Sequence, residues 1–443
     1  MVQYFTMENI IIVECTSSAT EYVRDARELG YNPVILEVFI DNPETLKVCE
    51  AFRRQWYKQI QAPLPEIIRD TGDFEILLSS VSAYEPVAVI PGHELGVALA
   101  SRLSEALGLP GNPVHIIPGM IEKYEMHKAL KRAGLRYIRS RKIKTTEEAL
   151  SFYREIKKSV VIKPDIGGGS IGCHICHSED EIIKVTETEL SSFNMYGDKN
   201  ETLLIQEFID GKEYVIDTIS QDGKHYFEFA AYYKKNTTHD GRKVYDITYY
   251  MKRDAESDTL RELIFYAFKV LDAIGIVVGP VHGEFMIDND GIVLMEINCR
   301  PCGSTPREFS DQIIGTHETL LGLKAYLGMD LSEISTLPKE EQTQNSPAKT
   351  YKSGLQKLII VPENMTVESA PILEWVKELP SYHSTEGIDG VFPRELPRTV
   401  DLATDGGMVY LLSADEEALW ADYKKIKDAE QNSFDKIYKY QSK

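Results

Sequence analysis

The chain has 443 residues, 43% of them hydrophobic, with 69 acidic against 49 basic residues and a formal net charge of −20. Its length predicts several domains and a large core. The acidic balance argues against binding to nucleic acid or to an anionic membrane, both of which need a basic surface. No apolar run approaches a membrane-spanning length and no signal peptide is evident, so a cytoplasmic protein is expected.

The first hundred residues alternate between predicted strands and predicted helices. Ser17 and Ser18 favour the start of a helix that runs to Leu29, and a second helix is predicted from Leu95 to Leu107. Short apolar runs predict strands at residues 10–13, 33–38, 74–78 and 86–90. This alternation is typical of a parallel, doubly wound α/β sheet.

The rest of the chain predicts shorter, mixed elements. Helices are expected at residues 122–133, 257–274 and 414–427. Strands are expected at residues 160–163, 203–209, 213–220, 356–361 and 408–412, and in a hairpin at 281–297. Residues 221–251, rich in tyrosine, predict antiparallel strands, and the polar segment 336–349 predicts a linker.

A glycine-rich loop follows the predicted strand that ends at Lys163. Gly167, Gly169 and Gly172 match the dinucleotide-binding fingerprint, but that motif needs a following helix, and residues 173–176 read as a strand. The pattern therefore indicates a hairpin whose backbone N–H groups can cover phosphates, with Lys163 beside it. A plain flexible loop is the alternative.

The predicted hairpin at 281–297 carries acidic residues among apolar neighbours. Glu296 and Asn298 are two residues apart and share a face. A three-residue turn with Gly291 in the left-handed conformation would place Glu284 opposite Glu296. Carboxylates this close repel unless a cation lies between them, and Mg²⁺ prefers such oxygen ligands. A solvated polar stripe is the alternative.

Further candidates surround these two segments. Arg300 follows the hairpin, where a guanidinium can hold a phosphoryl group or an anionic intermediate. Glu213, after the turn at 210–211, is a candidate for accepting ribose hydroxyls, or else a surface charge. Lys234 and Lys235 are expected to be solvated rather than to line a site.

Two pairs of cysteines have C-x-x-C spacing, Cys173 with Cys176 and Cys299 with Cys302. The spacing resembles a zinc or redox motif. In a strand, however, residues three apart point to opposite faces, so the first pair is expected not to chelate one ion. Structural zinc and disulfides are the less favoured alternatives.

Together these motifs resemble the ATP-grasp superfamily, and within it the carboxylate–amine ligases that include bacterial L-amino-acid (dipeptide) ligases. The resemblance rests on five motifs in order: residues 122–126, 162–170, 206–213, Glu284, and the segment from Glu296 to Arg300. Residues 92–97, 107–112 and 279–284 also look like these ligases. The resemblance covers about residues 8 to 425.

The resemblance implies an ATP-grasp fold: a parallel N-terminal sheet, two α+β subdomains that clasp ATP, and a small C-terminal α+β module. The expected boundaries are 1–118 for the N-terminal domain, 119–212 for the lid subdomain, 213–345 for the central domain and 346–443 for the C-terminal module.

The resemblance also implies roles for single residues. The expected ATP-binding residues are Lys123, Lys163, Gly168, Gly169, Ser170, Glu207, Phe208, Ile209 and Glu213. Glu284, Glu296 and Asn298 would hold magnesium, two ions being expected and manganese an accepted substitute. Arg300 and Lys163 would act on the reacting groups. Glu94, His282, Gly303 and Ser304 are the expected substrate contacts, with Glu94 and His282 also considered as the base for the amine.

The reaction so implied joins a carboxylate to an amine, an amino acid being at least one substrate, through an acyl phosphate with release of ADP and phosphate. Another ATP-grasp reaction, carboxylation or thioester formation, and a non-catalytic nucleotide-binding module are the alternatives. The segment 301–304 departs from the family's glycine-rich pattern, which leaves the substrate open. Small-molecule partners are expected, and a homodimer is left open.

Overall fold

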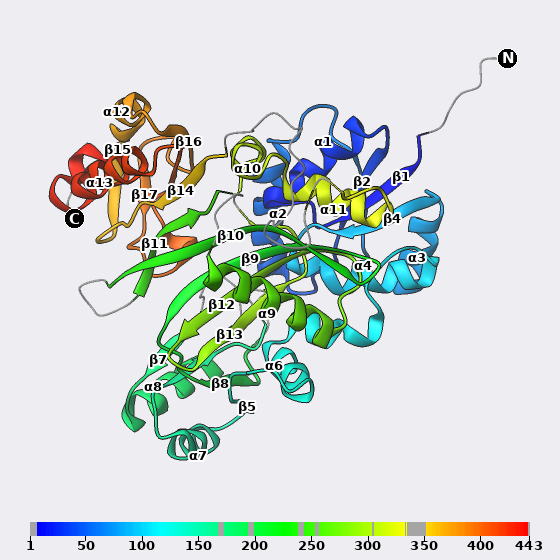
Figure 1. The fold of residues 1–443 in the computed structure, drawn as a ribbon, viewed down its shortest axis with the longest axis horizontal. Helices are drawn as coiled ribbons and strands as arrows, with labels where there is room; N and C mark the ends of the chain where they lie inside the picture. The colour runs from blue at the N-terminus through cyan, green and yellow to red at the C-terminus, as the bar shows by residue number, and fades with distance from the viewer. Residues whose placement is uncertain are drawn as a thin grey trace.

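The computed structural model of the protein describes residues 7–166, 172–193, 199–237, 243–252, 257–303, 305–332, 334 and 351–441. Figure 1 shows the N-terminal α/β part on one side, the lid sheet below, the long central sheet between them and the C-terminal elements at the opposite end. Among the described residues, no helix combines the length and apolarity that crossing a bilayer requires.

The N-terminal sheet is parallel, with the strand order β3-β2-β1-β4. Its strands are β1 (Asn9–Val13), β2 (Asn32–Glu37), β3 (Glu66–Arg69) and β4 (Pro86–Pro91), and its helices are α1 (Glu21–Glu28), α2 (Pro43–Tyr57), α3 (Phe74–Ser82) and α4 (Glu94–Leu107). Alternate residues of β1 enter two separate cores: Ile10 and Ile12 pack on one face, Ile11 and Val13 on the other. The predicted doubly wound sheet is confirmed.

One predicted strand of this sheet is wrong. Residues 74–78 belong to helix α3, because Asp73 caps it: its carboxylate accepts hydrogen bonds from the N–H groups of Glu75 and Ile76. Leu77 and Val81, four residues apart, bury one helical face. The third parallel strand is the short β3, which the prediction omitted.

The lid consists of an antiparallel sheet in the order β5-β8-β6-β7. Its elements are β5 (Ser140–Ile143), α7 (Thr146–Ile156), β6 (Val160–Lys163), β7 (His174–Cys176), α8 (Glu179–Leu190) and β8 (Leu203–Glu207). Helices α5 (Ile117–Ile121) and α6 (Lys123–Arg132) connect the N-terminal part to this sheet. The strand predicted after the glycine-rich loop is confirmed as β7.

The central sheet has the order β13-β12-β9-β10-β11-β14-β18-β16, with antiparallel neighbours throughout. Its first strands are β9 (Lys212–Gln221), β10 (Lys224–Thr237), β11 (Lys243–Tyr250), β12 (Gly279–Asp288) and β13 (Gly291–Asn298). Helix α9 (Asp258–Ile274) packs on the β9, β10 and β13 end. Helices α10 (Arg307–Ile314) and α11 (Glu318–Tyr326) follow the hairpin. The predicted tyrosine-rich antiparallel strands are confirmed.

The C-terminal strands extend the central sheet. The strands β14 (Ser353–Leu358), β16 (Tyr382–Glu386) and β18 (Met408–Ser413) lie beyond β11. A small sheet in the order β17-β15-β19 and two helices complete this end: β15 (Met365–Ser369), β17 (Arg394–Leu396), β19 (Lys439–Gln441), α12 (Ile372–Trp375) and α13 (Glu416–Asn432). The strand predicted at 356–361 begins earlier, at Ser353. The predicted linker, residues 336–349, lies wholly outside the described residues, and the domain boundaries stay a prediction.

Candidate active site

The β12–β13 hairpin places the predicted acidic residues opposite one another. Glu284 pairs with Glu296 across the two strands, and His282 pairs with Asn298. Side chains of directly paired residues lie on the same face of an antiparallel sheet. The two carboxylates and the Asn298 amide therefore share one face of the hairpin, as the sequence predicted.

The hairpin reaches this register by a different route from the one predicted. Asp288 pairs with Gly291, so two residues rather than three connect the paired ends. Gly291 has φ of 104°, as predicted for a turn glycine. The register then shifts by one residue between Glu284 and Phe285, and this irregularity brings Glu284 opposite Glu296.

Lys123 supplies the positive charge nearest to this pair. Its Nζ lies 2.9 Å from Oε2 of Glu296, and both side chains are buried. The Asn298 amide donates a 3.5 Å hydrogen bond to the other oxygen of Glu296. Burial alone would raise the pKa of Glu296, but Lys123 and Lys163 lower it to about 2. The lowered pKa keeps the Glu296 carboxylate ionised beside the Lys123 ammonium.

The lid strand β6 brings Lys163 to the same place. Burial lowers the pKa of Lys163 below its ordinary range, because a buried ammonium is poorly solvated. Just after it, the Asp165 carboxylate accepts a 2.9 Å hydrogen bond from the N–H of Tyr124, in the first turn of α6. Lys142 bridges Asp165 and Glu122 at 2.8 and 2.7 Å. These contacts hold the lid strand against the start of α6.

The hinge after β8 is already occupied by internal hydrogen bonds. The Glu207 carboxylate accepts a 3.0 Å bond from the N–H of Arg139 and lies 3.4 Å from its guanidinium. The Phe208 N–H donates to the carbonyl oxygen of Ser159. The Glu207 carboxylate and the Phe208 N–H, which the resemblance assigns to ATP, therefore already have partners within the protein.

An apolar patch lies beside the hinge. Ile209 packs with residues of β12, β13 and the approach to β5, namely Met286, Val293, Met295 and Ile138. A Cβ on Gly211 would lie 2.3 Å from the carbonyl oxygen of Ile287, so glycine is required where the hinge crosses β12. The apolar cluster around Ile209 therefore packs the hinge against the β12–β13 hairpin.

Glu213 lies among polar partners at the start of β9. Lys235 Nζ is 2.7 Å away, and the Tyr245 hydroxyl donates a 3.3 Å hydrogen bond to the carboxylate. Lys235 was expected to be solvated, which is wrong: alternation along β10 turns it towards the site, whereas Lys234 is exposed. Tyr233, two residues earlier, donates a 3.4 Å bond to Glu284. Alternation along β10 puts Tyr233 and Lys235 on one face, but the pairing of β10 with β9 decides that this face meets the site.

Arg300 and Glu94 meet across the boundary between the central sheet and the N-terminal part. Their guanidinium and carboxylate are 3.4 Å apart, and both side chains are mostly buried. Glu94 is the first residue of α4, and the capping side chain of His93 accepts from the next N–H. The structure therefore brings Glu94 to the predicted phosphoryl-binding arginine.

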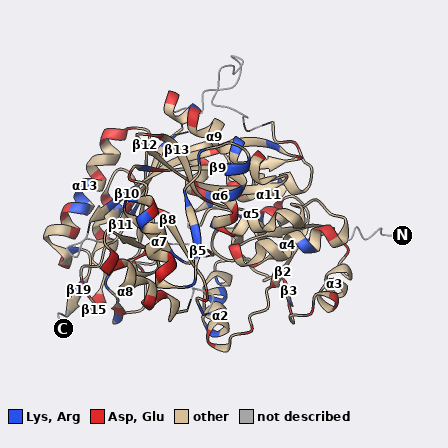
Figure 2. Ribbon diagram, turned by 90° about the horizontal axis from the view of Figure 1, so that it is seen from below, with Lys and Arg blue, Asp and Glu red and all other residues tan. Residues whose placement is uncertain are grey.

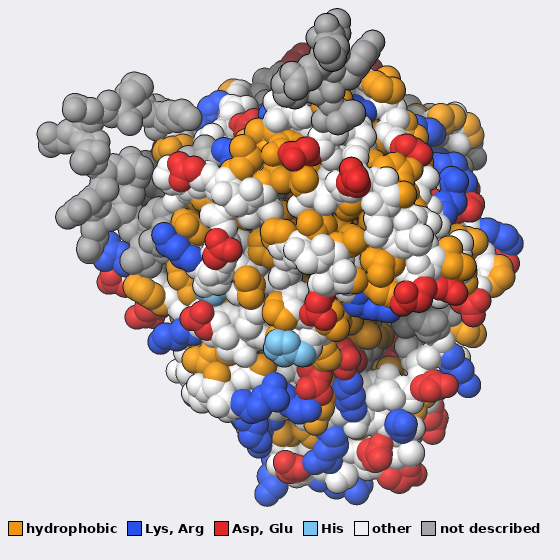
Figure 3. All heavy atoms as spheres, turned by 90° about the vertical axis from the view of Figure 1, so that its right-hand side faces the viewer, with side chains coloured by type: hydrophobic (Ala, Val, Ile, Leu, Met, Phe, Trp, Pro, Cys, Tyr) orange, Lys and Arg blue, Asp and Glu red, His pale blue; other side chains and the backbone are white. Residues whose placement is uncertain are grey.

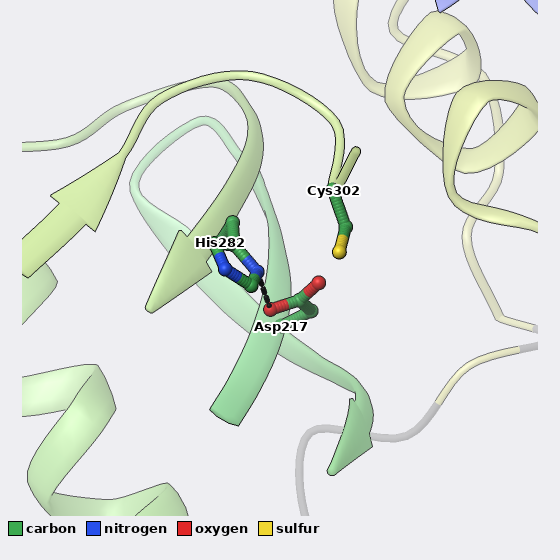
Figure 4. Close-up of side chains that lie close together, drawn as sticks. All are labelled: Asp217, His282 and Cys302. Atoms are coloured by element: carbon green, nitrogen blue, oxygen red, sulfur yellow. Dashed lines mark hydrogen bonds and ion pairs between the residues drawn. The ribbon is translucent and has the colours of Figure 1, made fainter. Parts of the chain in front are cut away.

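His282 stands at the centre of a buried polar cluster (Figure 4). Its Nδ1 is 2.8 Å from Asp217 and its Nε2 is 3.5 Å from Glu284. Burial opposes the charged imidazole, but the Asp217 carboxylate raises the pKa of His282 well above its usual range. Cys302 completes the cluster, and its thiol faces Asp217 and His282.

The cysteine pairs do not form the zinc sites considered from the sequence. Cys173 is exposed and Cys176 is buried, as expected for residues three apart near a strand. Among the described residues, the side chains near enough to hold one ion are Asp217, His282 and Cys302, so neither pair supplies both of its cysteines.

Four predicted ligand contacts cannot be placed. Gly168, Gly169, Ser170 and Ser304 lie outside the described residues. Gly303 is described and lies near Ser17, to whose hydroxyl oxygen an added Cβ would be 3.5 Å distant. The loop after Arg300 thus lies against the N-terminal part.

Basic residues gather on the lid side of the site, although the whole chain is acidic. The segment 128–144 has eight lysines and arginines and no acidic residue. Figure 2 shows basic residues on β5 and α6. Figure 3 draws the face on the right-hand side of Figure 1 and shows lysine and arginine side chains concentrated at its lower end. Several of these side chains pair with carboxylates from outside the segment, among them Arg136 with Asp288 and Arg141 with Glu155.

Comparisons with known proteins show which sequences resemble this chain. The sequence profile of the ATP-grasp domain matches residues 156–306. Dapdiamide A synthase of Enterobacter agglomerans is 27% identical over 317 residues, 70% of each chain. The carbamoyl phosphate synthase large chain of Thermotoga neapolitana is 24% identical, over 72% of this chain but only 28% of its own length.

Solved structures share the fold over nearly the whole chain. The L-amino acid ligase from Bacillus licheniformis superposes with a TM-score of 0.72 at 18% identity, covering 98% of this chain and 99% of its own. A carboxyaminoimidazole ribonucleotide synthase from Aspergillus clavatus, complexed with ATP, has a TM-score of 0.67 at 13% identity, over 96% and 98%. The ATP-grasp domain is therefore matched over residues 156–306, the whole chain shares the fold of these structures, and the predicted resemblance and fold class are confirmed.

Proposed function

We propose that the chain is an ATP-dependent ligase that joins a carboxylate to an amine through an acyl phosphate. The observation that carries this proposal is the convergence of Lys123, Glu296 and Asn298, with Glu284 paired beside them and Arg300 just beyond. This set offers ligands for a cation, counter-charges for phosphates and an anion-binding guanidinium in one buried place. Dapdiamide A synthase and the L-amino acid ligase, named above, are similar proteins whose names describe ligation.

ATP would bind between the lid and the β12–β13 hairpin. The apolar cluster around Ile209 would lie beside the adenine ring. Glu213, held by Lys235 and Tyr245, would accept the ribose hydroxyls. Lys123 and Lys163 would then meet the phosphates, whose negative charge would raise the lowered pKa of Lys163.

The residues present fit magnesium. Two carboxylates paired across a hairpin and one amide form a hard-oxygen donor set, and the Lys123 ammonium already acts as the counter-cation of Glu296. Glu284, Glu296 and Asn298 would hold the metal. When bound, the metal would offset the charge on the phosphate oxygens. The number of ions and acceptance of manganese stay predictions.

The chain's own side chains would divide the reaction between them. The substrate carboxylate attacks the γ-phosphorus, ADP leaves, and Lys123 and Lys163 offset the charge that spreads over the phosphate oxygens. Arg300, fixed by Glu94, would hold the acyl phosphate while the amine attacks its carbonyl carbon and phosphate leaves. The products are an amide, ADP and phosphate.

His282 is better placed to orient Glu284 than to accept a proton. Its two ring nitrogens face the carboxylates of Asp217 and Glu284, and the raised pKa keeps the imidazole protonated. A charged imidazole donates hydrogen bonds and cannot act as a base. Glu94 stays a candidate for contact with an amino group.

The test is to incubate the protein with ATP, magnesium and pooled amino acids and to identify the nucleotide product. We expect ADP and phosphate, formed only when amino acids are present, and loss of this turnover in Glu296→Ala with the fold intact. AMP as the product contradicts the acyl phosphate. ADP formed with bicarbonate and no amine supports a carboxylase instead, and no turnover with retained nucleotide binding supports a binding module. Cytoplasmic location and a homodimer stay predictions.

A further inference from the structure

A cavity of about 220 Å³ lies next to the proposed reaction site. It opens between α4, α5, the start of α6 and the end of β13, where α5 packs on the other three elements (Figure 2). Part of its wall is polar and belongs to the site already described, namely Glu94, Lys123 and Asn298. The cavity is therefore a side chamber of the site.

The remaining wall is apolar. It includes Leu95 and Ala98 of α4, Met120 and Ile121 of α5, and Ile166 and Ile297. Ile166 keeps 40% of its surface exposed. A ligand that filled the chamber would cover part of that surface and gain its burial.

The size of the chamber limits what it can hold. A water molecule takes about 30 Å³, and a cavity of about 150 Å³ lined by apolar side chains accommodates benzene. Pockets for drug-sized ligands are larger, about 300–1,000 Å³. A volume of about 220 Å³ thus suits one large aliphatic or aromatic side chain with the carbon that bears it.

The arrangement of the walls matches the groups on one α-carbon. A carboxylate near Lys123 and Asn298 would be in reach of the phosphate and metal residues. An ammonium would face Glu94, and a side chain would enter the apolar part. We propose that this chamber receives the side chain of the amino acid whose carboxylate is phosphorylated, and that donors with large apolar side chains are preferred. This inference rests on the proposed function.

The test measures acyl-donor preference with hydroxylamine as the amine. Hydroxylamine attacks the acyl phosphate at carbon and releases phosphate, so each amino acid that is activated gives its hydroxamate, one ADP and one phosphate. For the wild type we expect kcat/KM for phenylalanine or leucine to exceed that for alanine by about tenfold or more. Alanine or glycine as the best donor would overturn the inference.

Two substitutions and a matched control test the wall itself. Ala98→Leu fills the chamber and should lower the phenylalanine-to-alanine ratio of kcat/KM by about tenfold or more. Leu95→Ala enlarges it and should favour the bulkier donor. Ala106→Leu makes the same change as Ala98→Leu on the exposed side of α4 and should leave the ratio unchanged.

The outcomes separate this inference from the proposed function. An unchanged ratio in Ala98→Leu, with turnover retained, overturns the chamber assignment alone. If Ala98→Leu changes the preference among amine substrates but not the preference among acyl donors in the hydroxamate assay, the chamber holds the amine substrate. That result also overturns the inference. If the wild type makes no hydroxamate, the proposed function fails, and the remaining measurement is thermal stabilisation by phenylalanine in the presence of ADP and magnesium. Stabilisation that is lost in Ala98→Leu would still support binding of a large apolar side chain in the chamber. No stabilisation of the wild type would overturn the chamber as well.

Discussion

Lys123 Nζ lies 2.9 Å from Glu296 Oε2, and this buried ion pair links the first residue of α6 to the β13 strand of the acidic hairpin. Burial lowers the pKa of Lys123, but the Glu296 carboxylate more than reverses this effect. Each charge thus depends on the other. In the proposed reaction both would gain further partners, because phosphate oxygens approach the ammonium and a cation approaches the carboxylate.

Lys123→Met removes the ammonium and leaves Glu296 buried without it. Breaking a buried pair in this way costs about 3–5 kcal/mol of stability. We expect a lower melting temperature that magnesium raises more than it does in the wild type, and a higher KM for ATP. The measurement is thermal unfolding with and without magnesium. Lys128→Met, an exposed lysine of the same helix, is the control; an equal magnesium effect in all three proteins would contradict the account.

Arg300→Lys tests the role of the guanidinium. Lysine keeps the charge but cannot hold Glu94 and a phosphoryl oxygen with two planar N–H groups at once. We expect kcat to fall about 10²–10³-fold, as when one donor to a developing anion is lost, with little change in KM for ATP. Steady-state kinetics measure both values.

Arg307→Lys is the matched control for that experiment. Arg307 pairs with Asp25 and Glu28 of α1, and the proposed reaction gives it no part. The Arg307→Lys variant should be less stable than the wild type but should keep its kcat. A similar loss of kcat in both variants would indicate that Arg300 acts only through the fold.

His317 predicts how stability depends on pH. It lies 2.8 Å from Asp25 and 2.9 Å from Asp311. Burial opposes its charge, but these carboxylates raise its pKa to about 9. Because the pKa is raised, the stabilisation is complete below the unfolded value of about 6.5 and is lost as pH rises through 9, a difference of about 3 kcal/mol.

Urea unfolding between about pH 6 and 10 measures this effect. In the wild type the free energy of unfolding should fall across the window, and in His317→Gln the fall should be much smaller. His115→Gln, at an exposed position, should behave like the wild type. A wild-type curve that stays flat would show that His317 is not charged in the folded protein.

Much of the site could be predicted because its signals are local. The alternation around Glu284 and Glu296 and the turn glycine Gly291 lie within one hairpin, so spacing alone brought the carboxylates together. The turn length was wrong, since a register shift inside the strands compensates for a shorter connection. Glu284 therefore lies opposite Glu296 as predicted, although the turn is one residue shorter than predicted.

Other features depend on contacts that spacing does not carry. Residues 74–78 looked like a strand because they are apolar, whereas the cap at Asp73 and the burial of every fourth residue make them helical. Lys235 reaches Glu213 because β10 pairs with β9, in a register that shifts between Phe227 and Phe229. Glu94 and Arg300 are 206 residues apart in sequence, so their meeting is a property of how the N-terminal part packs on the central sheet.

The fate of the carboxylate oxygen tests the central claim most directly. An amino acid labelled with ¹⁸O in its carboxylate is incubated with the protein, ATP, magnesium and an acceptor amine, and the products are analysed by mass spectrometry. An acyl phosphate transfers one labelled oxygen to inorganic phosphate when the amine displaces it, and this is the result the account predicts. Label in AMP, or amide formation with unlabelled phosphate, would contradict it.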